Sequence, residues 1–383
     1  MGINIGLDIG AISVKLAALA SAEDRASLAS LCAATPSFRL VDWGDQALVL
    51  SEYLRIAGSP IQTTYDLLCE FHGVIPEERV DGIRVTGSGS RTIAKIVGLY
   101  YENEFKAIAH MMAAFHPDVR TVLELGGESS KYILLDGASI VDYDRSGECA
   151  AGTGSFIDQQ ATRMRYAVEE VGDVVATAAT AAQIAGRCSV FARSDMIHAQ
   201  QKGHTPAEIL RGLCDAVARN FKGSVVKGRK VAPRVALIGA VSQNAGVTDA
   251  LRGVFRLCGD ELIVPEHYAW CGAIGAAMLE AAETRKRSLR DVHRLRQHES
   301  AEERTQDTPV LSMDNVVLLR HRVAPYVPPP GMAPIPAYLG IDVGSVSTNV
   351  VVTDESGALI HEIYLRTAGR PMEAVQQGLS EVA

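Results

Sequence analysis

The stretch "INIGLDIGAISVKLAALA", residues 3–20, carries the strongest fold signal in the chain. Two apolar runs flank a short segment that contains Asp8 and Gly10, and this pattern predicts two β-strands joined by a tight turn. Because glycine has no Cβ, backbone N–H groups at such a turn can come close to phosphate oxygens. A carboxylate on the same turn can hold Mg²⁺, usually through water. The stretch therefore predicts one half of a nucleotide-phosphate site.

A second hairpin of the same kind lies in "TVLELGGESSKYILLDG", residues 121–137, where Glu124 stands 116 residues after Asp8. Glu124 precedes the glycine pair Gly126 and Gly127, as Asp8 precedes Gly10. Two further glycine segments, "IGAVSQNAG" and "GAIGAA", follow in third and fourth place. One hairpin alone is weak evidence, but the ordered set predicts a site that binds nucleotide phosphates.

The composition is that of a globular protein, with 383 residues, 47% hydrophobic and 21% charged residues, and a formal net charge of −8. At about 150 residues per domain, this length predicts two to three domains. Basic residues are scattered, so the sequence shows no footprint for nucleic acid or for an anionic membrane. No signal-peptide pattern is visible, and the uncharged run at residues 174–186 is shorter than the roughly 20 residues that span a bilayer. We therefore expect a soluble cytoplasmic protein without nucleic-acid or membrane partners.

The opening motif returns after a linker. Residues 284–308 are densely charged and residues 324–337 are rich in proline, so we interpret residues 284–337 as a semi-rigid connection. The segment "YLGIDVGSVSTNVVV" that follows repeats the opening glycines and places Asp342 where the first copy has Asp8. Residues 338–383 therefore begin a second copy of the same unit.

A second shared segment shows how the two copies differ in length. "YLRTAGRP", residues 364–371, repeats "YLRIAGSP", residues 53–60, at six of eight positions. The tyrosine of this segment follows the motif aspartate by 45 residues in the first copy and by 22 in the second, so the first copy carries an insertion of about 23 residues. The second copy is too short to build a lobe, and we expect the chain to be the N-terminal part of a larger tandem protein.

The seven cysteines show no framework spacing, which favours a reducing compartment. Cys149 and Cys188 stand apart because glycine and polar residues surround them. Neither lies in a C-x-x-C motif, so a self-contained zinc or ferredoxin site is not expected. Two thiolates are too few for a Cys₄ cluster, but they suffice if two domains each contribute a pair; two core thiols are the alternative. We expect ordinary core thiols at Cys32, Cys69, Cys214, Cys258 and Cys271.

The ordered phosphate segments resemble those of the ASKHA superfamily, which contains actin, Hsp70 and sugar kinases. The resemblance implies an α/β fold of two RNase-H-like lobes with Mg²⁺ and ATP in the cleft. It places the ATPase domain at residues 1–283, with lobe I at about 1–118 and lobe II at about 119–283. Carried over residue by residue, it implies that Asp8 and Glu124 are the catalytic carboxylates and that the nucleotide is bound by Gly10, Ser13, Gly126, Gly127, Glu128, Gly239, Ala240 and Asn244.

Three positions depart from the superfamily pattern. Ala11 stands where serine or threonine is usual, Glu124 replaces the commoner aspartate, and Ala240 replaces the second glycine of a pair. The lost hydroxyl at residue 11 weakens a phosphate contact by about 1 kcal/mol. These changes leave ATP binding expected and weaken the case for efficient hydrolysis.

The segments "CAAGTGSF" and "CSVFARSDMI", which begin at the two isolated cysteines, narrow the resemblance. With "VALIGAVSQNAGV" and "CGAIGAA", they resemble the BadF/BadG/BcrA/BcrD-type ATPases, the archerase-like activators of 2-hydroxyacyl-CoA dehydratases and the ATPase subunits of benzoyl-CoA reductase. The resemblance implies that Cys149 and Cys188 hold one [4Fe–4S] cluster at a dimer interface, with helix N-termini directed at it. We interpret the glycines after Cys149 as allowing it to lie at such a helix start.

The resemblance also implies a function. A ferredoxin or flavodoxin would reduce the cluster, and ATP would drive delivery of the electron at low potential to a partner dehydratase-like or benzoyl-CoA-reductase-like enzyme. The tandem layout implies a large fused activator, so either a homodimer or the second repeat would complete the cluster site. Two alternatives remain: an ASKHA kinase, for instance of an amino sugar, and a degenerate, non-catalytic ASKHA assembly module consistent with Ala11.

Overall fold

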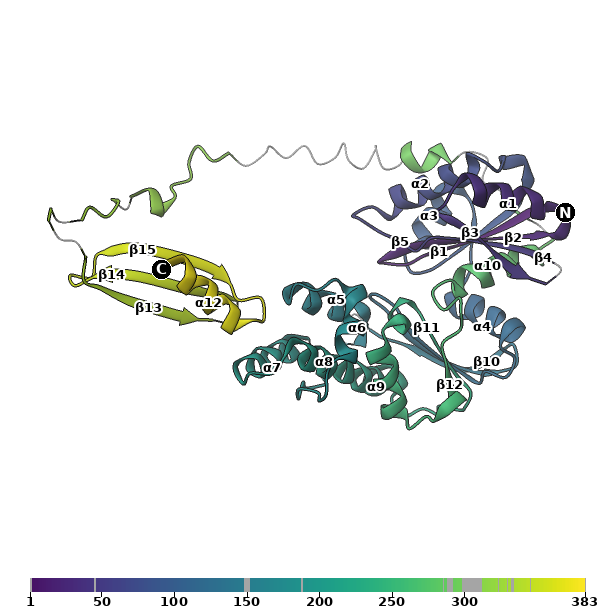
Figure 1. Ribbon diagram of the computed structural model, residues 1–383. Coiled ribbons are helices and arrows are strands. Elements are labelled where there is room, and N and C mark those ends of the chain that lie inside the picture. Colours follow the sequence, from purple (N-terminus) through teal and green to yellow (C-terminus); the bar gives the residue numbers. More distant parts are fainter. Residues whose placement is uncertain are drawn as a thin grey trace. The chain divides into compact units, whose positions relative to one another are not determined.

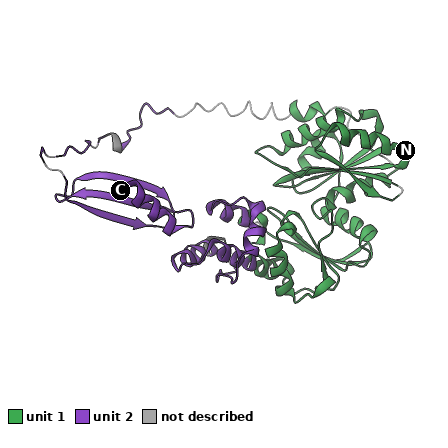
Figure 2. Ribbon diagram, in the orientation of Figure 1, with its two compact units in different colours: residues 1–156, 217–306 green, residues 157–216, 307–383 purple. Residues whose placement is uncertain are grey.

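The computed structural model describes residues 2–44, 46–147, 152–186, 189–284, 286–287, 292–297, 312–322, 324–328, 330–331, 334–344 and 346–382. These residues form two compact units, shown in separate colours in Figure 2. The first unit comprises residues 1–156 and 217–306, and it contains both hairpins that the sequence predicts. The second comprises residues 157–216 and 307–383. The expected domain boundary at residue 283 stays a prediction.

Lobe I of the first unit is built on a seven-stranded sheet in the order β3-β4-β2-β1-β6-β7, with β5 paired to β2. Strands β1 and β2 form the predicted antiparallel hairpin, and β1 also pairs in parallel with β6. The apolar side chains of β1 are fully buried, which explains why this stretch gave the strongest signal. The strands are β1 (Ile3–Ile9), β2 (Ser13–Ser21), β3 (Phe38–Trp43), β4 (Gln46–Ser51), β5 (Leu54–Arg55), β6 (Val80–Thr86) and β7 (Tyr100–Tyr101), and the helices are α1 (Arg25–Ala34), α2 (Pro60–His72) and α3 (Ser90–Val97).

Lobe II repeats this plan on a five-stranded sheet in the order β10-β9-β8-β11-β12. Three antiparallel strands are followed by two parallel ones, as β4, β2 and β1 are followed by β6 and β7 in lobe I. The expected α/β fold of two similar lobes is therefore confirmed. The strands are β8 (Thr121–Leu125), β9 (Ser130–Asp136), β10 (Ser139–Arg145), β11 (Val235–Ile238) and β12 (Leu262–Ile263), and helix α9 spans Ala245–Phe255.

Helices α4 (Glu104–Phe115) and α10 (Cys271–Ala281) pack together at the junction of the two lobes, as Figure 1 shows. Two glycines permit the close approach. A Cβ at Gly6 of β1 would overlap the carbonyl of Ala273, and one at Gly275 would overlap the carbonyl of Ala107. Small residues in "CGAIGAA" thus let α10 lie directly against β1 on one side and α4 on another.

The second unit contains the remaining helices and a three-stranded sheet in the order β13-β14-β15. Helix α5 begins in the first unit, and helix α8 ends there. The elements are α5 (Gly154–Arg163), α6 (Val171–Ala176), α7 (Ser189–Gln201), α8 (Pro206–Phe221), β13 (Ala337–Val343), β14 (Ser347–Asp354), β15 (Leu359–Arg366) and α12 (Pro371–Val382). A π-helical turn at Lys222–Val226 follows α8, and short 3₁₀ turns span Ala22–Asp24, Glu77–Arg79, Val168–Glu170, Ala240–Gln243, Gly259–Glu261 and Leu319–Arg322.

The two copies of the opening motif show what the insertion is. In the second copy, β14 is followed directly by β15, whereas α1 and β3 lie between β2 and β4 in the first copy. Strand β3 pairs only with β4 among the described strands and forms the edge of the sheet. The extra residues therefore build one helix and one added edge strand, and they leave the hairpin itself unchanged.

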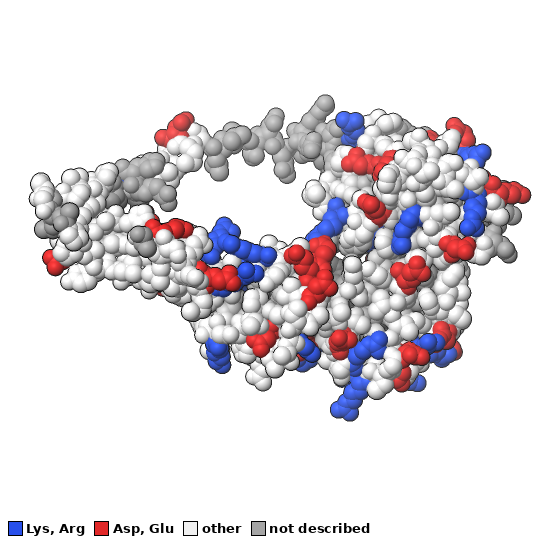
Figure 3. All heavy atoms as spheres, in the orientation of Figure 1, with Lys and Arg blue, Asp and Glu red and all other residues white. Residues whose placement is uncertain are grey.

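One expectation about the cysteines is wrong. Cys214 and Cys271 are buried and Cys32 and Cys69 are half-buried, but Cys258 is exposed because it lies in the turn between α9 and β12. Within the part of the chain described above, no helix is both long and apolar enough to cross a bilayer. On the face drawn in Figure 3, acidic and basic side chains are intermixed over both lobes.

Candidate functional site

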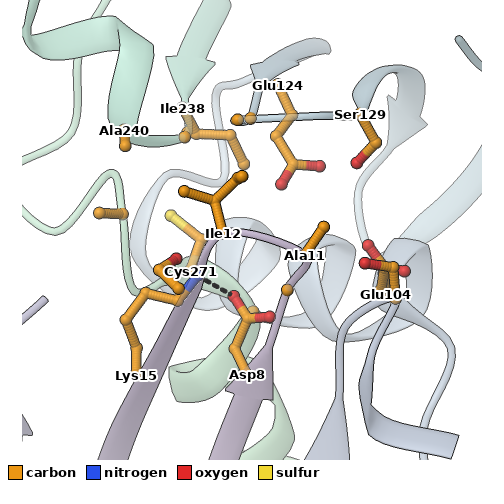
Figure 4. A pocket seen from close by; sticks show the side chains of 18 of the residues that line it. Asp8, Ala11, Ile12, Lys15, Glu104, Glu124, Ser129, Ile238, Ala240 and Cys271 are labelled. Atoms are coloured by element: carbon orange, nitrogen blue, oxygen red, sulfur yellow. Dashed lines mark ion pairs between the residues drawn. The ribbon is translucent and has the colours of Figure 1, made fainter. Parts of the chain in front are cut away.

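The two predicted turns have the same construction. In lobe I, Gly10 N donates to Ser13 O at 2.9 Å, and in lobe II, Gly126 N donates to Ser129 O at the same distance. Both hairpins follow one residue pattern, which is acid, any residue, Gly, any two residues, Ser, any residue, Lys. The turns face one pocket from the two lobes, as Figure 4 shows for Asp8 and Glu124.

Each acidic residue is paired with a lysine on the next strand. The antiparallel register places Lys15 opposite Asp8 and Lys131 opposite Glu124. Lys15 Nζ lies 2.9 Å from Asp8 Oδ2, and Lys131 Nζ lies 2.6 Å from Glu124 Oε2. Neither lysine was predicted from the sequence. The signal was present, because a lysine seven residues after the acid falls opposite it when the turn closes between the Gly and the Ser.

Lys131 has a second acidic partner, which the sequence analysis also missed. Its Nζ lies 2.6 Å from Glu104 Oε2 at the start of α4, and its side chain is 4% exposed. Burial alone would lower the pKa of Lys131, but the two carboxylates outweigh it and raise that pKa. Burial raises the pKa of Glu124, against the opposing effect of Lys131. This triad, with the buried Lys131 at its centre, joins the second turn to helix α4.

The donor set of the pocket suits a hard divalent cation. Four carboxylates line it, from Asp8, Glu104, Glu124 and Glu128, against the two ammonium groups of Lys15 and Lys131. This excess of negative charge would repel the phosphates of a nucleotide unless a cation neutralises it. Carboxylate oxygens are the ligands that Mg²⁺ takes in proteins, often through water. The residues present fit this ion held through water, because no three of the described carboxylates are grouped for direct ligation.

The third glycine segment closes the pocket from lobe II. Gly239 follows β11 with φ of +87°, and a Cβ there would overlap the carbonyl of Leu125. Ala240 lines the pocket beside it. Asn244 caps helix α9, where its Oδ1 accepts a hydrogen bond from Val247 N at 3.3 Å.

The structure thus brings most of the predicted site residues together. One pocket is lined by Asp8, Gly10, Ser13, Glu124, Gly126, Gly127, Glu128, Gly239 and Ala240. The roles assigned to these residues stay predictions. Cys149 and Cys188 lie outside the described residues, and within the described ranges no three histidine, cysteine or acidic side chains are grouped as metal ligands would be.

The pocket is small in this structure. Its cavity volume is about 60 Å³, whereas ligand sites usually measure about 300–1,000 Å³. Ile12 stands between the two turns, as Figure 4 shows, and a Cβ at Gly127 would overlap Ile12 Cγ1. A nucleotide could therefore enter only if Ile12 moves or the lobes separate.

The second copy keeps the turn but changes the lysine. Gly344 N donates to Ser347 O at 2.9 Å, as in both turns of the first copy. Asn349 stands opposite Asp342, and its Nδ2 lies 3.5 Å from Asp342 Oδ2. The turn therefore forms with or without a lysine opposite the acid. The acid–lysine pair is a separate feature of the first copy.

Two similar lobes, each presenting a glycine turn to a shared pocket, define the ASKHA fold. The chain belongs to the BadF/BadG/BcrA/BcrD ATPase family, whose model matches residues 5–280. This match confirms the family that the sequence motifs predicted.

Named relatives share part of their length with this chain. It is 32% identical over 174 residues to the 2-hydroxyisocaproyl-CoA dehydratase activator of Clostridioides difficile. The matched segment covers 44% of this chain and 64% of that protein. It is 30% identical over 171 residues to the (R)-2-hydroxyglutaryl-CoA dehydratase activating ATPase of Acidaminococcus fermentans, again 44% of this chain and 64% of that protein. The matched segment thus spans just under two thirds of each relative.

The fold agrees with a solved structure of the same class. The activator of the 2-hydroxyisocaproyl-CoA dehydratase from Clostridium difficile, solved with bound ADPNP, superposes with a TM-score of 0.58 at 22% identity. The superposition covers 80% of this chain and all of that one. It supports the two-lobed architecture.

Proposed function

We propose that the first unit binds Mg²⁺–ATP between the turns of Asp8 and Glu124 and uses it to drive single-electron transfer to a partner iron–sulfur enzyme. One observation carries the nucleotide part. The two turns share a residue pattern, a closing hydrogen bond and an acid–lysine pair, and they face one pocket. Membership of an ATPase family and the ADPNP-bound structure of a similar activator support the same conclusion.

Each residue class has a task in this proposal. The backbone N–H groups of the glycine turns would bind phosphate oxygens, and Lys15 and Lys131 would offset phosphate charge. Asp8 and Glu124 would hold Mg²⁺ through water and act as the catalytic carboxylates. Bound Mg²⁺ would supply the charge that lets a polyphosphate enter an acidic pocket. Gly239 and Ala240 would border the adenosine from lobe II.

We assign Cys149 and Cys188 as ligands of one [4Fe–4S] cluster, shared with a second pair of cysteines. The sequence motifs support this assignment, together with the position of two helices along the chain. Helix α5 begins five residues after Cys149, and α7 begins at the residue after Cys188. The positive end of a helix dipole favours a cluster that carries net negative charge. The second pair would come from a homodimer or from a complete second repeat.

The names of the relatives point to the partners. Both are described as activators of 2-hydroxyacyl-CoA dehydratases. We propose that this protein delivers its electron to an (R)-2-hydroxyacyl-CoA dehydratase-like or benzoyl-CoA-reductase-like enzyme, and that a ferredoxin or flavodoxin supplies it, in the cytoplasm. A bound cluster would provide the one-electron couple, whose potential depends on hydrogen bonding and exposure at its sulfurs.

Anaerobic purification with iron reconstitution tests the proposal. We expect a brown dimer with broad absorption near about 400 nm, the charge-transfer region of iron–sulfur clusters. The colour should be lost in Cys149→Ser and in Cys188→Ser, and kept in Cys258→Ser, because Cys258 is exposed in a surface turn. A colourless protein that phosphorylates sugars would contradict the proposal in favour of a kinase. A cluster without ATP turnover would favour the assembly module.

A further inference from the structure

The segment that contains Cys149 is fastened at both ends to the second phosphate hairpin. Before it, Ser146 N donates to Ser130 O at 2.8 Å, and Ser130 N donates to Ser146 Oγ at 3.0 Å. After it, Ser130 Oγ donates to Gly152 O at 2.8 Å. Ser130 is completely buried. One serine of the hairpin therefore holds the residues on both sides of the segment.

The turn itself is bonded to the start of helix α5. Gly154 N donates to Gly126 O at 2.9 Å, while Ser155 N and Ser155 Oγ donate to Gly127 O at 2.7 and 2.6 Å. A Cβ at Gly154 would lie 2.8 Å from Val241 Cγ2 and 3.4 Å from the Cα of Gly127. Gly154 is thus needed where the loop passes the turn, which is a second reason for the glycines that follow Cys149.

The bonded carbonyls belong to the peptide units that would contact phosphate. In a planar trans peptide the C=O and N–H groups point in opposite directions. The Gly126 carbonyl is therefore opposed to the N–H of Gly127, and the Gly127 carbonyl to the N–H of Glu128. A phosphate that accepts from these N–H groups would polarise the same peptides and strengthen the bonds from Gly154 and Ser155. It would also fix the orientation of those peptide planes.

We propose that Ser130 and Ser155 are positioning residues that transmit nucleotide occupation of the second turn to the residues on either side of Cys149. This inference rests on the proposed function, because it needs a nucleotide at the turn. It adds a structural route from the nucleotide to the Cys149 segment, in which the phosphate-binding peptides and the start of α5 move as one body. Ser155 makes the direct link to the turn, and the hydroxyl of Ser130 holds Gly152, the end of the segment next to α5, to the same hairpin.

Hydrogen–deuterium exchange of the full chain tests this route, with and without Mg²⁺ and a non-hydrolysable ATP analogue. In the wild type, the analogue should slow exchange in peptides that cover residues 124–131 and in peptides that cover residues 152–163. In Ser155→Ala and Ser130→Ala the first protection should persist, and the second should fall by about fivefold, the low end of coupling between two sites. Ser155→Thr keeps the hydroxyl and should restore it.

Ser90→Ala is the matched control. Ser90 is also completely buried and its Oγ donates to Gly87 O at 2.6 Å, but it lies in lobe I, away from the loop. Its protection pattern should equal that of the wild type. If Ser130→Ala fails to fold, as judged by circular dichroism, the half-buried Ser155 decides the result alone.

Two failures can be told apart. Protection of residues 152–163 that is the same in Ser155→Ala as in the wild type overturns the route. The route is also overturned if the analogue slows exchange in residues 124–131 of the wild type but not in residues 152–163. A wild type that shows no protection of residues 124–131 at saturating analogue contradicts the proposed nucleotide site, and the route falls with it.

Discussion

The two turns of the first unit have the same local structure and different surroundings. The carbonyls of the lobe I turn accept hydrogen bonds within that lobe, Ile9 O from Gly89 N and Ile12 O from Ile56 N, both at 2.8 Å. The carbonyls of the lobe II turn accept from Gly154 and Ser155, at the start of a helix that leaves the lobe. Among the described residues, the first turn is therefore bonded only within its own lobe, whereas the second is bonded to the helix start that the proposed route runs through.

The lysines show the same difference. Lys15 pairs with Asp8 inside its own hairpin, whereas Lys131 also reaches Glu104 on α4. Two residues before Glu104, Glu102 lies 2.8 Å from Arg84 of lobe I. The start of α4 is thus tied to lobe I by one acid and to lobe II by the next. A change at the second turn is placed to act on the junction of the lobes.

The largest difference should appear when each lysine is removed. Lys131→Met leaves two half-buried carboxylates facing each other. We therefore expect the free energy of unfolding to fall by about 3 kcal/mol, the low end of the range for breaking a buried ion pair. Lys15→Met leaves one carboxylate, and we expect about half that loss. Urea denaturation of the two variants measures both values. Equal losses would show that Glu104 adds nothing to the lobe II pair.

The next largest difference should appear in stability when a methyl group is added at the first glycine of each turn. A Cβ at Gly126 would lie 2.7 Å from Ser129 O, whereas the nearest atom to one at Gly10 is Ser13 O at 3.5 Å. We therefore expect Gly126→Ala to cost about 2 kcal/mol through overpacking and Gly10→Ala less than about 1 kcal/mol. Thermal melts of both variants give the comparison. A larger loss for Gly10→Ala would contradict the geometry of the turns.

The pH dependence of Mg²⁺–nucleotide binding should report on Glu124. Burial raises its pKa, and Glu104 raises it further, so the ionised form is lost at a higher pH than for an ordinary glutamate. If binding needs the ionised form, affinity falls as the pH drops through this raised pKa. Glu104→Gln removes the repulsion and should move the acid limb of the affinity profile to lower pH. An unmoved limb, measured by titration calorimetry across pH, would contradict the role of Glu124.

The smallest effect concerns the missing hydroxyl. Ala11→Ser should tighten nucleotide binding by about fivefold, the equivalent of one hydrogen bond worth about 1 kcal/mol. Gly127 holds the matching position in the second turn, where an added side chain would overlap Ile12. Gly127→Ser should therefore weaken binding. Equilibrium dialysis with a labelled nucleotide can rank the pair, and a gain in both variants would show that the turns are equivalent.

The sequence predicts the hairpins well because both are local structures. Apolar strands on either side of an acid–glycine turn leave few alternatives, and the antiparallel pairing follows from the short connection. The motif repeat also located the insertion, although its form as α1 and edge strand β3 depends on how those residues pack. The fold could therefore be predicted from the hairpins and the glycine segments that follow them, whereas the family needed the segments that begin at Cys149 and Cys188 as well.

Contacts between distant segments could not be predicted in the same way. Glu104 meets Lys131 only because α4 packs beside β9, and Ile12 meets Gly127 only because the two lobes close on each other. Asn244, which the resemblance assigns to the adenosine motif, caps helix α9 in the structure, and its contact with a nucleotide stays a prediction.

Binding of Mg²⁺–ATP to the intact chain tests the central claim most directly. Titration calorimetry should show nucleotide binding that requires Mg²⁺, because four carboxylates line the pocket against two lysines. Asp8→Asn and Glu124→Gln should each weaken it by about tenfold or more, the usual loss when a group that orients a metal's shell is removed. Binding without Mg²⁺, or affinity that neither variant changes, would show that the nucleotide does not lie between these two turns.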